Sequence, residues 1–503
     1  MSLCLAATRV IAISDAICAL VFGLSVFPSA NGVMASSPQA SITKIGSDID
    51  GEASGDGSGT AVATNSDGTI VAIGAYGNDD GGQFAGHVRV YQRTGEPPNW
   101  IQMGSDIDGG GVWKFFGSSV ALSSAGTILA VGEPGTGDSK GRVAVYQWSG
   151  GSWTRKGSDV VGEDPGDTSG AAIALNADGT ILAVGVSIND GEGENAGHVR
   201  VFESSSGDWV QMGSDIDGDA GDFSGKSVAL SHDGTILAVG AIGGSNGGHV
   251  AVYQWSSNSW TQRGSDIVAE AAGDRSGMSV SLSSDGTILA VGADENAGDL
   301  SRTLPPSPPA LYSYSYSYES GPRYGHVRVF QWSDKWSQMG SDIDGEAPDD
   351  RSGSTVSLSS DGTLLAVGAR GSDGTGDTAG HVRVYHWSGE WTQIAGDIDG
   401  EAAYDQFGIS VALSDDGGET WGPIRYDAAL ISPVCQASVA TIGRTVYFSN
   451  PDSTSARANI TIKASDDSAA TWERQLLVEA AASAGYSCLV QGGVSSTRGG
   501  ILF

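Results

Sequence analysis

Groups of acidic residues recur along the chain, each within or just after the phrase GSDID. Two of these groups are Asp48, Asp50, Glu52 and Asp56, and Asp342, Asp344, Glu346 and Asp349. Carboxylates at alternate positions of a loop can converge on a Ca²⁺ ion, so Asp48, Asp50, Asp342 and Asp344 are candidate ligands of a structural calcium. The spacing is not that of an EF-hand, and Asp-Gly pairs also supply hairpin turns. Calcium binding and plain turn chemistry both explain these residues, and the sequence requires no other cofactor.

The overall charge limits the partners of the protein. Acidic residues outnumber basic ones 59 to 26 in 503 residues, which gives a net charge of −33. Such a surface repels nucleic acid and anionic membranes, and it suits cations, basic partners or solubility in salt. No nucleic-acid partner is therefore expected.

The N-terminus resembles a targeting segment. Arg9 precedes a mostly apolar run, Val10 to Phe27, and small residues follow, so cleavage after Ala30 or Ala35 fits a signal peptide. The same run is close to the shortest length of a membrane span, which makes an uncleaved anchor the alternative. Residues 1–35 are thus predicted to be a signal peptide or signal anchor, and the protein to be secreted or displayed at the cell surface. There, Cys435 and Cys488 could form a disulfide or remain two buried thiols.

A repeat fills most of the chain. The phrase GSDID, or a close variant, begins at Gly46, Gly104, Gly157, Gly213, Gly264, Gly340 and Gly396. One longer step contains a Pro-rich and Ser-Tyr-rich insert at about 300–324, which is typical of a surface loop. Each unit has four short β-branched runs separated by turn signals; in the fourth unit they span 227–230, 235–241, 249–255 and 259–267. Residues 45–413 are therefore predicted to be all-β, as a β-propeller of six or seven four-stranded blades.

Two phrases within each unit make this prediction more specific. The units follow the general pattern FGxSVALSxDGTILAVGA and then GHVRVYQW, and Phe116-Gly117 and Phe407-Gly408 carry the FG pair of this pattern. The pattern resembles the FG-GAP-type repeats that build propellers such as those of integrin α-subunits. Units five and six have Arg275-Ser276-Gly277 and Arg351-Ser352-Gly353 instead of the FG pair. The resemblance implies a non-enzymatic extracellular platform that binds glycans or a protein partner.

The repeat stops inside its seventh unit. From Ser414 the sequence follows the pattern S-x-D-x-G-x-T-W through Ser414, Asp416, Gly418, Thr420 and Trp421, and a decayed copy spans Ser465 to Trp472. Between and after the two copies lie Phe448-Ser449-Asn450-Pro451 with Arg457, and Gly485-Tyr486-Ser487. In this order the segments resemble the C-terminal part of an exo-α-sialidase, whose Asp-boxes are structural hairpins. Residues 414–503 are thus predicted to be a partial sialidase-like propeller segment.

The resemblance implies roles for two residues. Arg457 would bind the sialic acid carboxylate through its planar guanidinium, and Tyr486 would be the nucleophile, because a neutral phenol is not repelled by that carboxylate. The substrates would be sialylated glycans or other glycoconjugates. The other two arginines of the family's triad, its acid Asp and its activating Glu have no matching segment. The chain is therefore predicted to be a sialidase-family protein with an incomplete catalytic set, with little activity as written; the alternative is the non-enzymatic binding propeller.

Overall fold

A computed structural model describes residues 44–414 except 46, 96–98, 137–138 and 298–322, and the backbone of the strands outside this range. The chain divides into two compact units, Met1–Gly422 and Pro423–Phe503. The described residues contain strands and no helices, and among them no helix is long and apolar enough to cross a membrane. The predicted all-β fold is confirmed.

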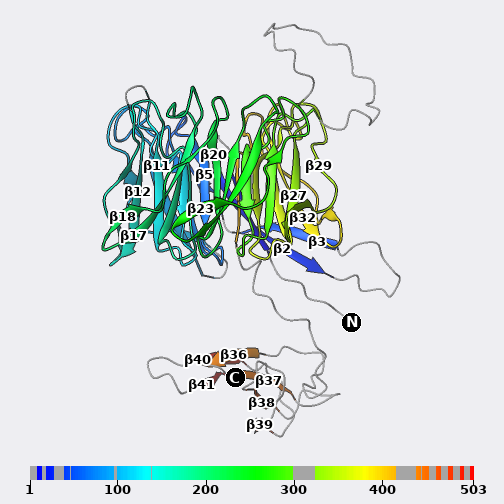
Figure 1. Cartoon of the computed structure of the whole chain (residues 1–503). Coiled ribbons are helices and arrows are strands. Elements are labelled where there is room, and N and C mark those ends of the chain that lie inside the picture. The colour runs from blue at the N-terminus through cyan, green and yellow to red at the C-terminus, as the bar shows by residue number, and fades with distance from the viewer. Residues whose placement is uncertain are drawn as a thin grey trace. The chain divides into compact units, whose positions relative to one another are not determined.

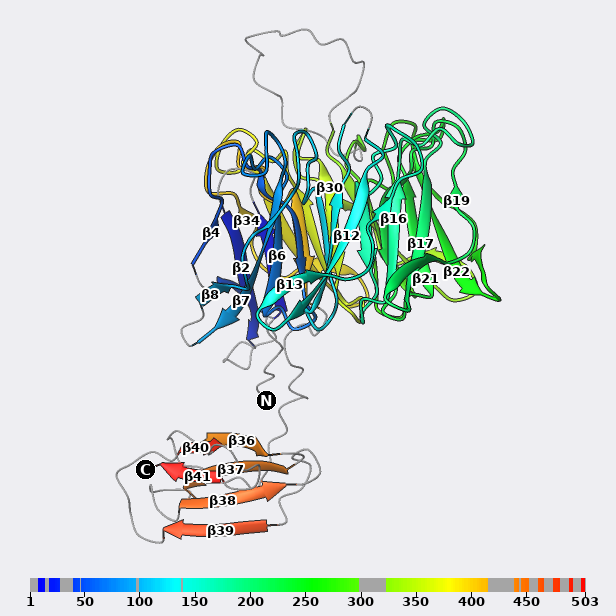
Figure 2. The same cartoon turned by 90° about the vertical axis from the view of Figure 1, so that its left-hand side faces the viewer.

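Six blades are complete antiparallel sheets of the first unit (Figures 1 and 2). In each, four consecutive strands form a meander, and a fifth strand of two residues pairs with the third. Blade one contains β5 (Ser58–Thr64), β6 (Ile70–Ala75), β7 (His87–Thr94), β8 (Asn99–Gln102) and β9 (Ile107–Asp108). Blade two contains β10 (Ser119–Leu122), β11 (Ile128–Glu133), β12 (Arg142–Ser149), β13 (Ser152–Arg155) and β14 (Val160–Val161). Blade three contains β15 (Ala172–Leu175), β16 (Ile181–Val186), β17 (His198–Ser205), β18 (Asp208–Gln211) and β19 (Ile216–Asp217).

The next three blades repeat this order. Blade four contains β20 (Ser224–Leu230), β21 (Ile236–Ala241), β22 (His249–Ser256), β23 (Ser259–Gln262) and β24 (Ile267–Val268). Blade five contains β25 (Ser279–Leu282), β26 (Ile288–Ala293), β27 (His326–Trp332), β28 (Trp336–Gln338) and β29 (Ile343–Asp344). Blade six contains β30 (Ser352–Leu358), β31 (Leu364–Ala369), β32 (His381–Trp387), β33 (Trp391–Gln393) and β34 (Ile398–Asp399).

A seventh sheet combines the two ends of the repeat region. Its inner strand is β35 (Ser410–Leu413), which pairs with β1 (Thr8–Ile13); β2 (Cys18–Phe27) and β3 (Gln39–Lys44) follow, and β4 (Ile49–Asp50) pairs with β2. β35 lies between β30 and β5, so the inner strands form a closed ring. The Ser410 hydroxyl accepts a hydrogen bond from the Val62 amide (3.2 Å), and the Leu413 amide donates to the Ser357 hydroxyl (3.0 Å). The strands β1, β2 and β3, the first two of which lie in the predicted targeting segment, thus supply outer strands of this sheet.

The second unit is described by its backbone. It contains the antiparallel sheet β36 (Ser438–Ile442), β37 (Thr445–Pro451), β38 (Ile460–Ser465) and β39 (Arg474–Glu479), and the pair β40 (Cys488–Gln491) and β41 (Gly499–Leu502).

The predicted strands of the fourth unit need one correction. The run 259–267 forms two strands, β23 and β24, which pair with opposite ends of β22. The chain turns at Gly264, whose φ is +88°, a conformation that glycine adopts without a steric penalty. The GSDID phrase is therefore the turn that returns the chain to the other end of the third strand.

Hydrogen bonds within the SxDGT phrase explain why this phrase recurs. In blade four the Ser231 hydroxyl accepts from the Ile236 amide (2.9 Å), and Asp233 accepts from the Thr235 amide (3.0 Å). These contacts satisfy backbone amides of the hairpin between the first two strands. Ser414 follows β35 as Ser231 follows β20, and it is buried in the same way. Ser414, the first residue of the predicted Asp-box, thus also occupies the serine position of the SxDGT phrase of the repeat.

Paired glycines set the distance between neighbouring blades. A Cβ built on Gly240 in β21 would lie 2.2 Å from the carbonyl oxygen of Gly277, which precedes β25 of the next blade. Gly74 and Gly117, and Gly368 and Gly408, approach in the same way, with corresponding distances of 2.0 and 2.1 Å. The glycine of the second strand is thus needed because no side chain fits there, and a Cβ on Gly117 of the FG pair would itself lie 2.6 Å from the His87 carbonyl oxygen.

Gly240→Ala is expected to lower the free energy of unfolding by at least about 3 kcal/mol, since the new methyl group would overlap a backbone carbonyl that cannot move without shifting a blade. Gly396→Ala is the matched control, because its Cβ would meet no atom within 4 Å, and the expected change is below about 0.5 kcal/mol. Denaturant unfolding of the two variants measures the difference. Equal stability of both would contradict the proposed role of the glycine pairs.

Candidate functional site

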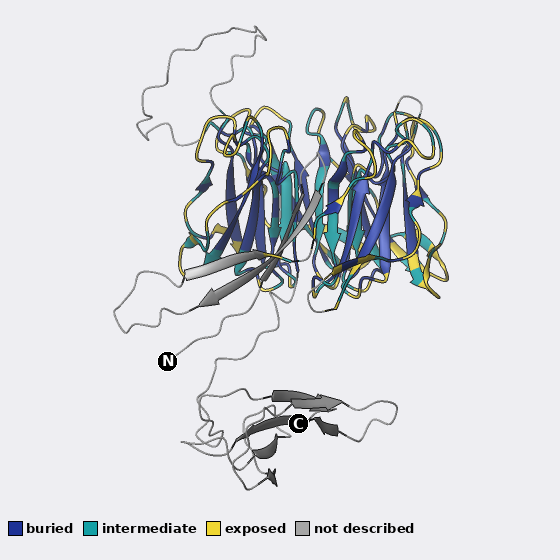
Figure 3. Ribbon diagram, turned by 180° about the vertical axis from the view of Figure 1, so that it is seen from behind, coloured by how far each residue is buried: buried dark blue, intermediate teal, exposed yellow. Residues whose placement is uncertain are grey.

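The connections at one end of the ring carry most of the unusual side chains. They join the second and third strands of each blade, and the last strand to the first strand of the next blade. We call this end the loop face; exposed residues are concentrated in the connections at both ends of the ring, whereas the strands between them are largely buried (Figure 3). Loops on a rigid β scaffold are the usual place for binding residues.

A pocket of about 540 Å³ opens on the loop face between blade six and the connection to β35. Its walls are polar, with the guanidinium groups of Arg351 and Arg370, the phenol of Tyr404, and several carboxylates and amides. The complete lining is Pro348, Asp349, Arg351, Arg370, Gly371, Asp373, Asp377, Thr378, Tyr404 and Gln406. The Tyr404 hydroxyl lies 3.4 Å from Asp377 Oδ2, and 66% of the tyrosine is exposed. The volume and the mixture of donors and acceptors fit a small, hydroxyl-rich ligand.

The backbone at Tyr404 is in a conformation that favours glycine. The equivalent loop position is Gly55, Gly166, Gly221 and Gly273 in four other units, with φ between +83° and +97°. Tyr404 has a φ of +68°, and Asp349 and Trp113 occupy the same position with +67° and +56°. A non-glycine residue in this region costs roughly 1–2 kcal/mol. Three of the seven loops therefore present a side chain on the loop face where glycine would be more stable.

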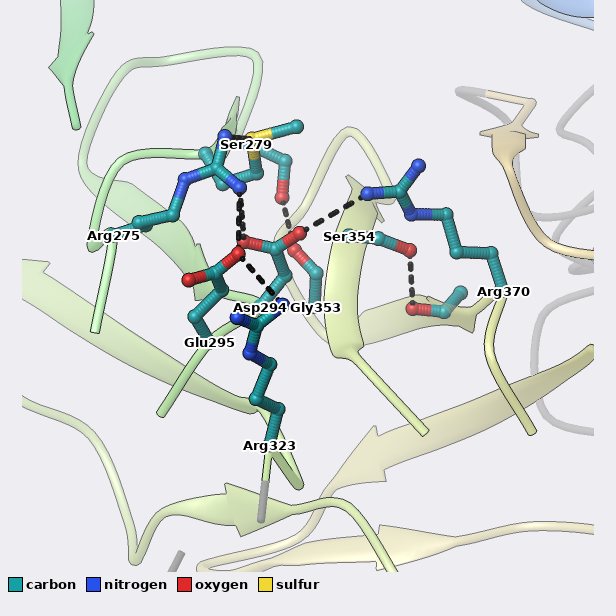
Figure 4. A network of polar contacts seen from close by, with 10 residues as sticks. Arg275, Ser279, Asp294, Glu295, Arg323, Gly353, Ser354 and Arg370 are labelled. Atoms are coloured by element: carbon teal, nitrogen blue, oxygen red, sulfur yellow. Dashed lines mark hydrogen bonds and ion pairs between the residues drawn. The ribbon is translucent and has the colours of Figure 1, made fainter. Parts of the chain in front are cut away.

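A buried polar network borders the pocket (Figure 4). Asp294 is fully buried, and Arg370 of the pocket lies 3.4 Å from its Oδ2. Arg275 is 3.9 Å from the other oxygen of Asp294 and donates to Glu295 (3.0 Å). Burial lowers the pKa of the nearby Lys226 ammonium, and the positive charge of Arg275 lowers it further. The network fixes Arg370 by a charge-assisted contact and so pre-organises one wall of the pocket.

An aromatic cluster lies in the loops between blades one and two. Phe84 stacks on Trp113 with ring centroids 4.7 Å apart, and Phe115 lies against both rings and against Tyr76. Trp113 is 43% exposed. Here the sequence GGGVWKFFG replaces the acidic loop of the other units, so a comparison of the units could have revealed the site. Exposed aromatic rings suit the apolar faces of sugars or a hydrophobic partner.

Histidines at the start of the third strands form a further repeated feature, which the sequence analysis missed. Four of them belong to rim clusters, each defined as one histidine and two carboxylates with possible ligand atoms within 4.8 Å of one another. The five rim clusters in the described part of the chain are Glu52, Asp80 and His87; His87, Asp106 and Asp108; Glu163, His198 and Asp215; Glu270, His326 and Asp342; and His381, Asp397 and Asp399. The signal in the sequence is the repeated HVRV phrase, but the partners of each histidine come from distant positions.

Burial governs the protonation of these clusters. It lowers the pKa of His198, and, with the nearby Arg328 and Arg383, it lowers the pKa of His326 and of His381 to about 4. Burial also raises the pKa of Glu270 and of Asp399, and neighbouring carboxylates add to the effect. The imidazoles of His326 and His381 are therefore neutral at physiological pH.

Thermal stability is expected to fall as the pH is lowered from 6.5 towards 4. In this range the unfolded state protonates His326 and His381, whereas the folded state does not, so the unfolded state binds more protons. Each histidine accounts for up to roughly 3 kcal/mol. The raised pKa values of Glu270 and Asp399 act in the opposite direction, at the acid end of the range. Between pH 6.5 and 4 the melting temperature of the full chain should fall more steeply than that of the double variant His326→Gln/His381→Gln. Equal slopes of melting temperature against pH would contradict this assignment.

The predicted calcium ligands differ in their surroundings. Asp342 belongs to the rim cluster of His326, whereas Asp48, Asp50 and Asp344 belong to no rim cluster. Asp48 forms an ion pair with Lys44, and the Asp50 carbonyl accepts a hydrogen bond from Arg89 (2.7 Å). Calcium binding at these residues stays a prediction.

The predicted sialidase-type residues are not among the side chains that the structure describes. Arg457, Tyr486, Asp416, Gly418, Thr420 and Trp421 lie outside the described residues, as do the side chains of Cys435 and Cys488. Ser414 is described, at the hairpin position given above. The side-chain geometry therefore concerns the propeller only.

Comparisons with known proteins support the fold and give one lead on function. No protein-family model matches the chain. A stretch of 91 residues is 40% identical to a sialidase of Bacteroides fragilis (strain YCH46), and the match covers 16% of this chain and 17% of that protein. Among solved structures, the fold is similar to that of a candidate 6-phosphogluconolactonase from Bacteroides uniformis ATCC 8492, with a TM-score of 0.51, 12% identity and coverage of 81% of this chain and 99% of the other. The periplasmic gluconolactonase PpgL of Pseudomonas aeruginosa gives a TM-score of 0.42 at 15% identity, covering 80% and 96% of the two chains. At 12% identity, the first of these solved structures supports the propeller fold alone.

Proposed function

We propose that this protein is a carbohydrate-binding β-propeller, and that the pocket between blade six and the connection to β35 holds the glycan. The observation that carries the proposal is the pocket itself, in which Arg351, Arg370 and the exposed Tyr404 face a volume of about 540 Å³. Guanidinium and carboxylate groups form paired hydrogen bonds with sugar hydroxyls, and guanidinium groups also bind sugar carboxylates. The Tyr404 ring offers an apolar face for stacking.

The charge of the pocket bears on the class of glycan. Asp349, Asp373 and Asp377 stand beside Arg351 and Arg370, so carboxylates outnumber guanidinium groups by one. Arg370 is already paired with Asp294, which leaves Arg351 as the main group for a sugar carboxylate. Neutral or singly acidic glycans fit this balance better than polyanionic ones. Sialylated glycans belong to the singly acidic class, and the predicted extracellular location would expose the protein to them.

A glycan array tests the proposal with the full chain as the probe. We expect retention on a restricted set of neutral or singly acidic glycans. Arg351→Ala is expected to lose the acidic glycans first, because it removes the less engaged guanidinium. An array with no signal above background, or an Arg351→Ala pattern equal to that of the wild type, would contradict the assigned pocket.

Sialoside hydrolysis by residues 414–503 is the second candidate function. It is favoured by the partial match to a sialidase, which covers 16% of this chain. The roles would be those implied by resemblance, with Arg457 on the substrate carboxylate and Tyr486 as nucleophile. A phenol with a pKa near 10 needs a positioned base to act at neutral pH, and the sequence offers no matching Glu, so turnover near background is expected. Turnover of a fluorogenic sialoside that Tyr486→Phe abolishes would instead establish an active sialidase.

A further inference from the structure

His87 begins β7 and is only 1% exposed, yet its Nδ1 atom has no hydrogen-bond partner. This nitrogen lies 3.6 Å from Glu52 Oε2. A buried polar atom without a partner costs free energy, so native structures usually satisfy each one. An imidazole nitrogen that takes part in no hydrogen bond can offer its lone pair to a metal ion.

Two separate pairs of carboxylates lie near this imidazole. His87 is shared by two rim clusters, with Glu52 and Asp80 in one and Asp106 and Asp108 in the other. The nearby cation is Arg89, whose Nη1 is 3.8 Å from Glu52 Oε1, and whose Nη2 donates to the Asp50 carbonyl. Arg89 therefore contacts one oxygen of Glu52 while the other oxygen faces His87. Negative charge exceeds positive charge at this place, which favours binding of a cation.

The next blade provides an internal comparison. Arg142 stands at the start of β12, where blade one has His87 at the start of β7. Its guanidinium contacts Glu133 Oε2 at 2.5 Å and Asp159 Oδ2 at 2.7 Å. Asp159 is the GSD aspartate of its unit, as Asp106 is in blade one. In blade two, carboxylates at this position of the repeat contact the Arg142 guanidinium, whereas in blade one they lie near the His87 imidazole.

We propose that the rim cluster of His87, Glu52 and Asp80 binds a divalent transition-metal ion, with His87 Nδ1 and Glu52 Oε2 as its central ligands. Ligands at about 2.1 Å from a tetrahedral ion lie roughly 3.4 Å apart, close to the 3.6 Å between these two atoms. A mixed nitrogen and oxygen set selects ions such as Zn²⁺, Co²⁺ or Mn²⁺ over Ca²⁺, which prefers oxygen ligands alone. The site is independent of glycan binding and differs from the four predicted calcium ligands.

The ion would stabilise the ring where its two ends meet. Glu52 lies in the connection from β4 of the seventh sheet to β5, whereas Asp80 and His87 belong to the connection between β6 and β7 and to the start of β7. A metal bound by both would therefore link the seventh sheet to blade one. Binding to the folded state alone raises stability in proportion to the logarithm of the metal concentration.

Cobalt and zinc ions added to the full chain after treatment with a chelator test the proposal. We expect Co²⁺ to produce the visible absorption of a nitrogen- and oxygen-ligated ion, Zn²⁺ to displace it, and each to raise the melting temperature. His87→Gln should lose one equivalent of bound metal relative to His249→Gln, the matched control, since His249 begins β22 but belongs to no rim cluster. Equal metal content and equal melting shifts in the two variants would overturn the proposal.

Glu52→Gln provides a test that does not depend on a buried residue, because the Glu52 side chain is 41% exposed and its replacement should leave folding intact. We expect at least a tenfold weaker affinity for Co²⁺, since a neutral amide replaces a charged ligand. Unchanged affinity would contradict the assignment of Glu52. Displacement of Co²⁺ by an equal concentration of Ca²⁺ would overturn the preference for a transition metal.

Discussion

A chain that begins at Ile45 is expected to lose the cooperative unfolding transition of the full propeller, because it lacks three of the four main strands of the seventh sheet. β1 pairs with β35 from Val10↔Leu413 to Ile13↔Ser410, and β2 and β3 continue the sheet outward. Without them, β35 keeps four residues with an unpaired backbone edge.

The size of this effect follows from the backbone hydrogen bonds that the truncation removes. Each such bond contributes about 1 kcal/mol net, and the ladders of β1 with β35 and of β2 with β4 would both be absent. The destabilisation is therefore comparable with the whole stability of a domain, about 5–15 kcal/mol. Denaturant unfolding of the full chain and of the chain from Ile45 measures it. A truncated chain that melts within a few degrees of the full chain would contradict the seventh sheet.

The same strands bear on the predicted targeting segment. Cleavage after Ala30 or Ala35 would remove β1 and β2, which supply two of the four main strands of the seventh sheet, whereas the inner ring closes through β35. A complete seventh sheet therefore predicts that the mass of the mature protein includes β1, β2 and β3. A mature protein that starts at Asn31 or Ser36 would support the signal peptide and leave the ring to close without these strands.

Tyr404→Gly is expected to weaken glycan binding by at least tenfold and, at the same time, to stabilise the protein. The variant removes the stacking surface of the pocket, and stacking of an aromatic ring contributes on the order of 1 kcal/mol or more. It also places glycine where φ is +68°, which relieves roughly 1 kcal/mol of backbone strain. These opposite effects are characteristic of a residue retained for binding rather than for folding.

The two effects are measured separately, the affinity by calorimetric titration with the glycan that the array selects, and the stability by denaturant unfolding. Trp113→Gly is the control for affinity alone, because it makes the same substitution at the equivalent loop position, with a φ of +56°, outside the pocket. It should keep the affinity of the pocket, whereas its stability is not compared with that of Tyr404→Gly, because it also removes the stacking of Trp113 on Phe84. A Tyr404→Gly variant with wild-type affinity would exclude Tyr404 from the site.

The strands of the blades could be predicted from the sequence because each alternates apolar and polar residues between clear turn signals, as 227–230 and 235–241 do in the fourth unit. The seventh blade could not, since the apolar run from Val10 to Phe27 has the composition of a leader, and its pairing with β35 spans almost the entire repeat region. Strand pairing at such a separation leaves no local pattern in the sequence.

The candidate sites were harder to predict than the fold for a related reason. Tyr404 and Trp113 differ from glycine at one position of the repeat, a signal that appears only when the units are compared with each other. Glu52 and His87 belong to different parts of the repeat and meet because the connection from β4 passes beside the start of β7. Arg370 acquires its role through Asp294 of another blade. Each site therefore depends on contacts that only the closed ring creates.

The assignment of the glycan site is tested by titration of the full chain with its array-selected glycan, compared between wild type, Arg351→Ala and Lys335→Ala. Arg351 lines the pocket on the loop face, whereas Lys335 is an exposed cation in the turn between β27 and β28 at the other end of the ring. The proposed function predicts that Arg351→Ala weakens binding by at least tenfold, the loss of one charge-assisted hydrogen bond of about 1.5–3 kcal/mol, and that Lys335→Ala leaves it unchanged. Equal affinities in all three proteins would contradict the assignment of the loop-face pocket as the glycan site.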